Sequence, residues 1–305
     1  MSINFQNNFG VSLGERKIDI KKQYEKEFSL KLFKRTINKT GPRRLYHANK
    51  STTTLDLALS AYKNFIKKNK KFDASQIYNL IFVTETNNYC FPGNSFLFAS
   101  KLNLRSKIRL YDLNLGCTGF VEALDLAHKL NGNSLIICAE TYSKHIKKFD
   151  RSTSSLFSDG GSIFYYNKKE IKILNSFRFF RKNSYDDLSS KQNNLYMDGK
   201  KVFDFVNSEV VILLKSILKK NKKINLVFIH QASLTVENLI KNKLKEFKIT
   251  IPSNIKKIGN TVSSSIPHLI NEYLKNNKIK KNSEILLCGF GVGLSVSASI
   301  LKIKK

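Results

Sequence analysis

Short apolar runs alternate with amphipathic segments along most of the chain. The runs with the length and composition of buried strands are 80–83, 108–115, 134–139, 162–166, 225–229, 284–288 and 294–301. The segments with apolar residues at helical spacing are 54–68, 118–130, 207–219, 234–247 and 266–276. Because strands that are apolar on both faces need helices packed against them, the alternation predicts an α/β protein with buried sheets.

A loose internal repeat divides the chain. In each half an apolar strand is followed later by a glycine-containing turn that leads into another strand, at 159–163 and again at 289–301. This pattern predicts two similar halves that meet near residue 170. The segment 181–194 is rich in Lys, Asn and Ser, and it predicts an exposed loop or a poorly packed insertion.

The charge of the chain is strongly positive. Lys and Arg number 53 against 23 Asp and Glu, which gives a formal net charge of +30. Such a field attracts nucleic acid, anionic lipid, acidic proteins or phosphate-bearing substrates. Most lysines are scattered, so we interpret them mainly as solvated surface, with an acidic carrier protein as the next explanation. The short run of Phe and Arg at 177–181 is explained better as a strand with a basic face than as a nucleic-acid site.

The remaining composition narrows the classes of protein. The four cysteines lack the spacing of a metal site, and Cys138 and Cys288 stand in apolar runs typical of buried small side chains. The N-terminus has no apolar core of a signal peptide, and no apolar stretch approaches the ~20 residues that span a bilayer. We therefore expect a cytoplasmic protein with no disulfide framework, no metal and no membrane insertion.

Cys117 is the first candidate for chemistry, because it lies between the predicted strand 108–115 and the predicted helix 118–130. At a helix N-terminus, unpaired N–H groups and the helix dipole favour a thiolate and offer donors to an oxyanion. Gly116 and Gly119 would let backbone and substrate approach closely. The pattern alone fits a nucleophile and a buried small residue about equally well.

Two more polar residues stand at the ends of predicted elements. His230 follows the run 225–229, and an ionisable side chain at the end of a buried strand suits a site above the sheet. Asn260 precedes the helix predicted at 266–276. The alternatives are a structural histidine and an ordinary turn or N-cap asparagine. A cysteine with a histidine and an asparagine elsewhere in the chain is a known nucleophile arrangement.

The motifs taken together resemble the β-ketoacyl-acyl-carrier-protein synthase III family of the thiolase superfamily. The segments that match, in the family's order, are 40–44, 91–92, 112–120, 139–141, 150–153, 156–160, 197–203, 230–232, 259–261 and 289–293. The resemblance covers nearly the whole chain. It implies a thiolase fold, in which two similar α/β halves give α-β-α-β-α layers. Residues 1–170 would carry the nucleophilic Cys117, and residues 171–305 would carry His230 and Asn260.

The resemblance also implies a mechanism. Cys117 attacks an acyl thioester, and the oxyanion is held by the backbone N–H groups of Cys117 and of a residue near Gly293. His230 and Asn260 then donate hydrogen bonds to the carbonyl of a malonyl thioester as CO2 leaves, and the carbanion attacks the acyl-cysteine. The substrates would be acyl-coenzyme A or acyl-carrier protein together with malonyl-carrier protein. No cofactor would be bound permanently.

Further roles follow from the same resemblance. Phe91 would reach across a homodimer interface into the partner's acyl pocket. The residues that would line the acyl tunnel or its mouth are Leu156, Phe157, Met197 and Phe203, although plain core packing also explains Leu156 and Phe203. The residues that would contact the donor's nucleotide or phosphates are Arg151 and, near the N-terminus, either Lys39 with Thr40 or Arg35 with Thr36.

The sequence departs from the family where coenzyme A binds. The chain has no Trp to stack with Arg151 on adenine, and residues 233–235 lack an arginine that contacts phosphate. Val292 replaces the middle of three glycines. Two enzymes therefore fit: one that starts fatty acid synthesis from a short acyl-coenzyme A, and a specialised relative that uses carrier-bound donors for a surface glycan, a lipid or a secondary metabolite. An acyl carrier protein is the expected partner, and a nucleic-acid-binding protein is the competing class.

Overall fold

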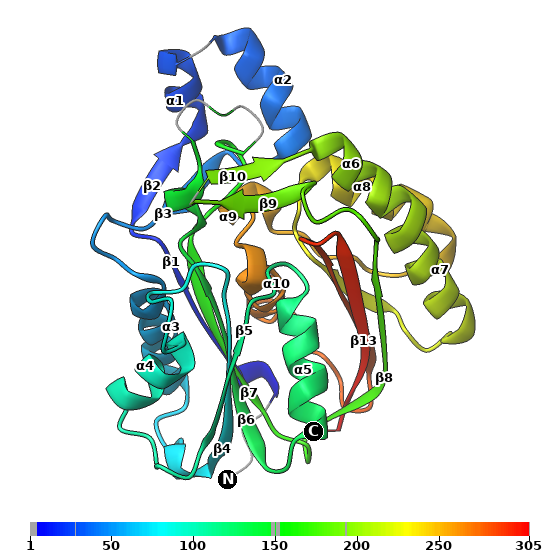
Figure 1. Cartoon of the computed structure of the whole chain (residues 1–305). Coiled ribbons are helices and arrows are strands. Elements are labelled where there is room, and N and C mark those ends of the chain that lie inside the picture. Colours follow the sequence, from blue (N-terminus) through cyan, green and yellow to red (C-terminus); the bar gives the residue numbers. More distant parts are fainter. Residues whose placement is uncertain (1–4, 28, 148–149, 151–152, 193, 305) are drawn as a thin grey trace.

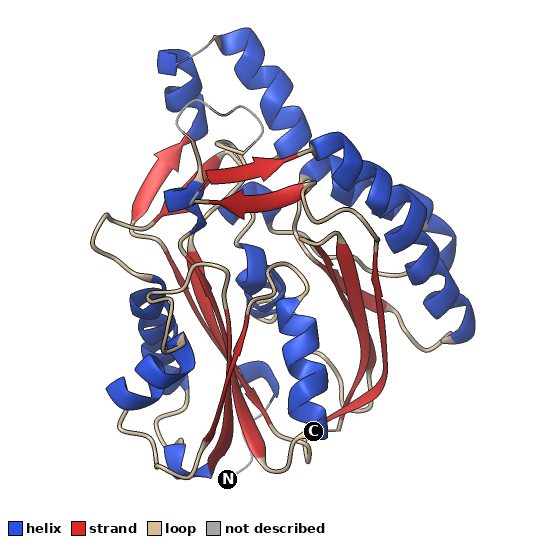
Figure 2. Ribbon diagram, in the orientation of Figure 1, coloured by secondary structure: helices blue, strands red, loops and turns tan. Residues whose placement is uncertain are grey.

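Two large β-sheets and three layers of helices build the main body of the molecule, and two smaller sheets of two strands each, β2 with β3 and β9 with β10, add to it (Figures 1 and 2). The computed structural model describes residues 5–27, 29–147, 150, 153–192 and 194–304. One helical layer covers the outer face of each sheet and a third lies between the sheets. From one side to the other, the helices are α3 (Thr54–Lys68) and α4 (Asn94–Lys101), then α5 (Gly119–Lys129) and α10 (Ser265–Tyr273), then α7 (Val211–Lys220) and α8 (Leu234–Lys243). The predicted α-β-α-β-α layer order is confirmed.

The first sheet has the strand order β1-β7-β6-β4-β5. Strand β4 runs parallel to its neighbours β5 and β6, whereas β7 is antiparallel to both β6 and β1. Helices cover both faces of this sheet, which explains why β4 and β6 are continuous apolar runs instead of alternating ones. The strands are β1 (Phe9–Leu13), β4 (Ile77–Val83), β5 (Arg109–Leu113), β6 (Asn133–Glu140) and β7 (Gly160–Tyr166).

The second sheet repeats this order as β11-β12-β13-β8. As in the first sheet, two neighbouring strands are parallel, here β11 and β12. Strand β13 then pairs antiparallel with β12 on one side and with β8 on the other. At the outer edge, where β5 lies in the first sheet, Thr250 makes one parallel bridge to Leu226. The strands are β8 (Ile171–Phe180), β11 (Leu226–Ile229), β12 (Glu284–Gly291) and β13 (Ser295–Ile303). The boundary at residue 170 stays a prediction, which this repeated order supports.

The elements that the pattern did not indicate are mostly short and gather at one end of the molecule. Two of these helices, α2 and α6, flank the cavity described below. The described elements not yet bounded are β2 (Arg16–Asp19), α1 (Ile20–Glu27), α2 (Leu30–Thr40), β3 (Arg44–His47), α6 (Gly199–Phe205), a π-helical stretch η4 (Val206–Val210), α9 (Ile255–Ile258) and the 3-10 turns η1 (Phe5–Asn7), η2 (Ala74–Gln76), η3 (Tyr142–His145), η5 (Lys245–Phe247) and η6 (Val262–Ser264).

The segment 181–194 differs from its prediction. Instead of an exposed loop, it contains β9 (Leu188–Lys191), which pairs antiparallel with β10 (Asn194–Met197). Leu188 and Leu195 are buried among otherwise polar neighbours. Because single apolar residues among Lys, Asn and Ser leave no visible periodicity, the sequence did not indicate this hairpin.

The core agrees with the predictions for the structural cysteines. Cys138 and Cys288 are buried, and both are free thiols. None of the helices that the structure describes is both long enough and apolar enough to cross a bilayer.

Candidate active site

A cavity of about 600 Å³ opens at the end of the molecule that carries α2 and the β9–β10 hairpin. Cys117, His230 and Asn260 all line it, although they come from distant parts of the sequence. Cys117 follows β5, His230 follows β11, and Asn260 lies between α9 and η6. Because the carboxyl ends of strands from both sheets point toward this end, residues that follow those strands converge here.

Cys117 lies against strand β12, and two glycines of this strand allow the contact. A Cβ atom built on Gly289 would lie 2.4 Å from the carbonyl oxygen of Cys117, and one on Gly291 would lie 2.8 Å from its Sγ atom. Real Cβ atoms essentially never approach so closely. Only glycine therefore lets the second sheet pass directly beside this thiol, which is itself only 6% exposed.

Some features around the Cys117 thiol raise its pKa and others lower it. Burial raises its pKa most, and the nearby negative charge of Glu85 raises it further. The backbone N–H groups of Val292 and of Cys117 itself lower the pKa by donating to the sulfur. Burial outweighs these donors, so the thiol form is favoured, contrary to the expectation from the helix N-terminus alone.

The second backbone donor beside Cys117 belongs to Val292, one residue before the predicted Gly293. Neither of these two residues is among those that line the cavity, but only the Val292 N–H is a hydrogen-bond partner of the sulfur. The Gly293 carbonyl oxygen instead accepts a hydrogen bond of 2.8 Å from the Ser184 hydroxyl. A backbone N–H leaves no signature in the sequence, which explains why the glycine drew attention and the valine did not.

His230 is a neutral imidazole in this site. It is only 2% exposed, and burial lowers its pKa to about 3. Its backbone N–H donates to the Cys288 carbonyl oxygen over 2.9 Å, and its ring meets the ring of Phe290 edge to face, with centroids 5.6 Å apart. Its Nδ1 atom has no hydrogen-bond partner within the part of the chain that the structure describes. A neutral imidazole fixed in this way can donate one hydrogen bond into the cavity.

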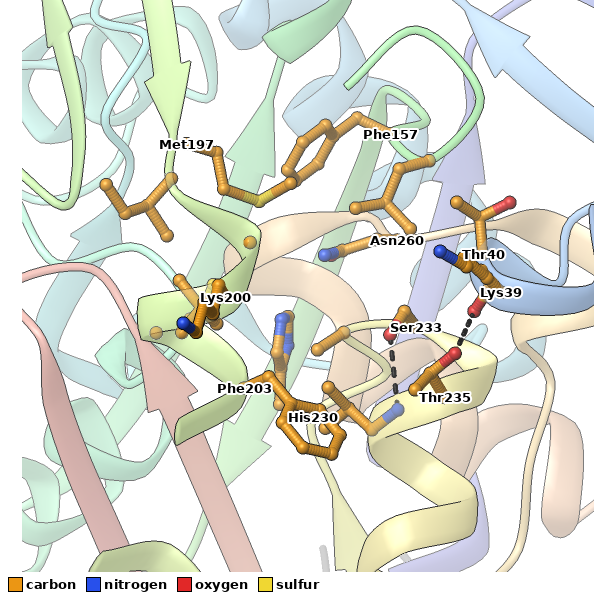
Figure 3. Close-up of a pocket in the computed structure, with 18 of the residues that line it drawn as sticks. Lys39, Thr40, Phe157, Met197, Lys200, Phe203, His230, Ser233, Thr235 and Asn260 are labelled. Atoms are coloured by element: carbon orange, nitrogen blue, oxygen red, sulfur yellow. Dashed lines mark hydrogen bonds between the residues drawn. The ribbon is translucent and has the colours of Figure 1, made fainter. Parts of the chain in front are cut away.

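Asn260 is fixed as a hydrogen-bond donor. Its Oδ1 atom accepts the Val262 N–H over 2.8 Å, which assigns the other end of the amide as NH2. Figure 3 shows this nitrogen directed into the cavity. The backbone N–H of Asn260 donates to the Leu156 carbonyl and its own carbonyl accepts the Ser158 N–H. Val262 adopts a φ of 51°, a strained value for a β-branched residue, and this turn aims its N–H at Asn260.

The cavity walls are mainly apolar. The four predicted tunnel residues all line the cavity, and Leu188 of the β9–β10 hairpin joins them as a residue that the sequence did not indicate. Figure 3 places Phe157 and Met197 on one side of Asn260 and Phe203 below them. The apolar residues that line the cavity are Leu32, Leu156, Phe157, Leu188, Met197, Val202, Phe203, Ala232, Val236 and Phe290.

Cationic and hydroxyl side chains from α2 and α6 also line this cavity. Lys39 and Thr40 line it as predicted, and the Thr235 hydroxyl ties α8 to α2 by donating to the Lys39 carbonyl over 3.0 Å. Arg35 and Lys200 add positive charge. The predicted contact at Arg151 lies outside the described residues.

Phe91 occupies a different place from the other predicted residues. It is 86% exposed, on the connection between β4 and α4, and it does not line the cavity of its own chain. Among the described residues, no group of three His, Cys, Asp or Glu side chains could hold a metal ion.

Comparison with known proteins points to one family. Residues 111–177 match the family model of 3-oxoacyl-[acyl-carrier-protein] synthase III, and residues 215–303 match the model of its C-terminal part. The β-ketoacyl-[acyl-carrier-protein] synthase III of Coxiella burnetii is 31% identical over 275 residues, covering 84% of this chain and 86% of that protein. The synthase of the same name from Streptococcus agalactiae is 31% identical over 282 residues, covering 84% and 87%.

Solved structures show the same fold. The 3-oxoacyl-(acyl-carrier protein) synthase of Burkholderia xenovorans superposes with a TM-score of 0.88 at 25% identity, over 97% of this chain and 93% of that one. The synthase III of Aquifex aeolicus superposes with a TM-score of 0.86 at 25% identity, over 97% and 98%. The predicted thiolase fold is thereby confirmed. With this fold, these matching models and relatives of 31% identity over most of its length, the chain belongs to the β-ketoacyl-[acyl-carrier-protein] synthase III family and is an acyltransferase of the condensing type.

Proposed function

We propose that this chain catalyses a decarboxylative condensation between an acyl group held on Cys117 and the carbanion derived from malonyl-carrier protein. One observation carries the proposal. A buried thiol, an imidazole kept neutral by burial and an amide fixed as a donor converge on one largely apolar cavity. This set provides a nucleophile and two uncharged hydrogen-bond donors, which a thioester exchange followed by enolate formation requires.

In the first step the Cys117 sulfur attacks the carbonyl carbon of the acyl thioester. We assign the N–H groups of Cys117 and Val292 as the donors to the oxyanion, because both lie next to the attacking sulfur. The proton of the Cys117 thiol passes to the departing thiolate, so that an acyl-cysteine and a free thiol result. Loss of one such donor typically reduces the rate by ~10²–10³-fold.

In the second step His230 and the Asn260 amide donate to the thioester carbonyl of the malonyl group. As CO2 leaves, the electron pair of the broken C–C bond becomes an enolate that these two donors hold. The enolate carbon attacks the acyl-cysteine, a new C–C bond forms, and Cys117 departs as the thiolate. Because the pKa of His230 is lowered to about 3, the imidazole stays neutral throughout the physiological range of pH.

The lining of the cavity supports a phosphate-bearing donor with an apolar acyl group. The apolar walls suit the acyl chain, while Arg35, Lys39 and Lys200 suit a phosphate on the carrier arm. This chemistry is common to coenzyme A and carrier protein. The chain has no Trp, so adenine cannot stack on an indole, and this favours a carrier-bound donor. A specialised relative of the fatty-acid enzyme is therefore the second candidate.

We also propose a homodimer. Phe91 is a large apolar side chain with 86% exposure, and Tyr89, two residues away, is 57% exposed. A second copy of the chain would bury both side chains. A monomeric mass in light scattering at micromolar concentration would contradict this arrangement.

Intact-protein mass spectrometry tests the acyl transfer. The protein is incubated with acyl-coenzyme A and acyl-carrier thioesters of increasing chain length, and an adduct of one acyl group is expected. Cys117→Ser should abolish the adduct, whereas Cys90→Ser should retain it, because Cys90 is an exposed thiol away from the cavity. Labelling by carrier-bound donors alone identifies the specialised enzyme. An adduct that survives in Cys117→Ser would refute the nucleophile.

A further inference from the structure

A group of titratable side chains that the proposed reaction does not use lies behind the nucleophile. Glu85 follows β4, Glu140 is the last residue of β6, and Tyr142 is the first residue of η3. Tyr142 lines the cavity together with Cys117, and it is 5% exposed. All three residues thus lie at or just after the carboxyl ends of strands β4 and β6 of the first sheet, close to the turn that contains Cys117.

Glu85 packs directly on this turn. Its carboxylate accepts the backbone N–H of Gly116, the residue immediately before Cys117. A Cβ atom built on Gly116 would lie 2.5 Å from the Oε2 atom of Glu85, so a glycine is needed for the carboxylate to fit. On its other side, the Tyr142 hydroxyl donates to the same Oε2 atom over 2.7 Å.

Glu140 is the second carboxyl group of this cluster. The backbone N–H of Glu85 and the Thr86 hydroxyl donate to its Oε2 atom over 3.1 and 2.9 Å, and the Ser263 hydroxyl donates to its Oε1 atom over 2.7 Å. Burial raises the pKa of both carboxyl groups, and the nearby charge of Glu85 raises that of Glu140 further, to about 8. The pair therefore carries its full double charge only at alkaline pH.

We infer that Glu85 is a positioning residue for the nucleophile: its carboxylate holds the Gly116–Cys117 turn and places a negative charge beside the Cys117 thiol. The charged or titratable groups that act on Cys117 are Glu85, Glu140 and Tyr142. Of the two carboxylates, Glu85 is the one that contacts Gly116, the residue next to Cys117. The inference rests on Cys117 as the nucleophile of the proposed function, but the proton affinity of this thiol is measurable without any acyl transfer.

Glu85→Gln separates charge from position. The glutamine retains an oxygen that can accept from Tyr142 and Gly116, whereas the negative charge is lost. The rate of iodoacetamide alkylation at Cys117 is measured from pH 7 to 10.5 by peptide mass spectrometry, in a Cys90→Ser background that removes the exposed thiol. We expect the midpoint of this profile to fall by about one pH unit in Glu85→Gln, which is about tenfold faster alkylation at pH 9.

Two controls distinguish this charge effect from general loosening of the site. Glu122→Gln removes a carboxylate from the first turn of α5, the helix that follows Cys117, and it should leave the midpoint unchanged. Glu140→Gln should lower the midpoint by less than Glu85→Gln does, because Glu85 is the stronger influence of the two on the thiol. A folded Glu85→Gln protein with an unchanged or higher midpoint overturns the inference.

The wild-type protein provides a second test that does not depend on how any variant folds. Its Cys117 should titrate above the ordinary thiol pKa of about 8.5, since burial and Glu85 both oppose the thiolate. A wild-type midpoint below this value refutes the inference. Failure of acyl transfer, by contrast, would remove the proposed function while leaving this titration interpretable.

Discussion

Gly291→Ala provides a quantitative test of the packing around the nucleophile. The added methyl group would lie 2.8 Å from both the Cβ and the Sγ atoms of Cys117. Ordinary contacts between such atoms begin near 3.5–4.0 Å, so one partner must move by about 1 Å. Gly291 is the last residue of the buried strand β12, which hydrogen bonds to β11 and β13 hold in place. We therefore expect the Cys117 side chain to be the group that moves.

A displacement of about 1 Å at a reacting atom typically reduces the rate by ~10²-fold. Transfer of an acyl group to Cys117 should therefore slow by about this factor in Gly291→Ala. The φ of 155° at Gly291 adds a backbone cost, and together with overpacking it should lower the free energy of unfolding by about 2–4 kcal/mol. Stability is measured by urea unfolding, and acylation by rapid-quench intact mass.

Gly199→Ala is the matched control. Gly199 also lines the cavity, but a Cβ atom built there meets nothing within 4 Å. This variant should acylate at the wild-type rate. If Gly291→Ala acylates as fast as Gly199→Ala, then the thiol does not lie against β12 as described, and the assignment of the oxyanion donors at Val292 would also fall.

Three further predictions follow from the structure. His230→Ala and Asn260→Ala should each reduce CO2 release from malonyl-carrier protein by ~10²–10³-fold while self-acylation persists, because each removes one donor to the enolate; loss of self-acylation in either would contradict these roles. The pKa of Glu140 is raised from 4.5 to about 8 in the folded chain, so the stability from its protonated form is complete below pH 4.5 and lost as pH rises through 8. The Tm of Glu140→Gln should accordingly rise relative to wild type between pH 5 and pH 9, and a constant difference would contradict the shift. Leu214→Ala, at a fully buried position of α7, should cost about 2–5 kcal/mol in urea unfolding, whereas Ile212→Ala, at a 63% exposed position, should change stability by less than about 0.5 kcal/mol; equal losses would contradict the burial assigned to α7.

The sequence predicted those elements whose local signals agree with one another. Helix α3 has the predicted bounds because apolar spacing coincides with a capping box, in which the Thr53 and Asp56 side chains satisfy each other's backbone N–H groups. The sequence indicated only the end of strand β8, through the run of Phe and Arg at 177–181. This strand lies at the edge of its sheet and is mostly exposed beyond Ile173, so polar residues interrupt any apolar run.

The three proposed catalytic residues were found by motif order and not by local pattern. Cys117, His230 and Asn260 each had an ordinary structural explanation when considered alone. Their convergence on one cavity depends on two sheets packing with the carboxyl ends of their central strands at the same end of the molecule. No periodicity within a window of the sequence reports a contact between positions more than a hundred residues apart.

The sequence by itself determined the α/β layering and most of the buried strands, because the spacing of apolar residues along a strand or helix records which of its faces is buried. Only the tertiary structure decided the chemistry around Cys117. It placed the Val292 N–H at the sulfur, the Leu188 hairpin over the cavity and the Glu85 carboxylate beneath the thiol. Desolvation and charge act through space, so the proton affinity of Cys117 depends on neighbours that the chain brings together only by folding.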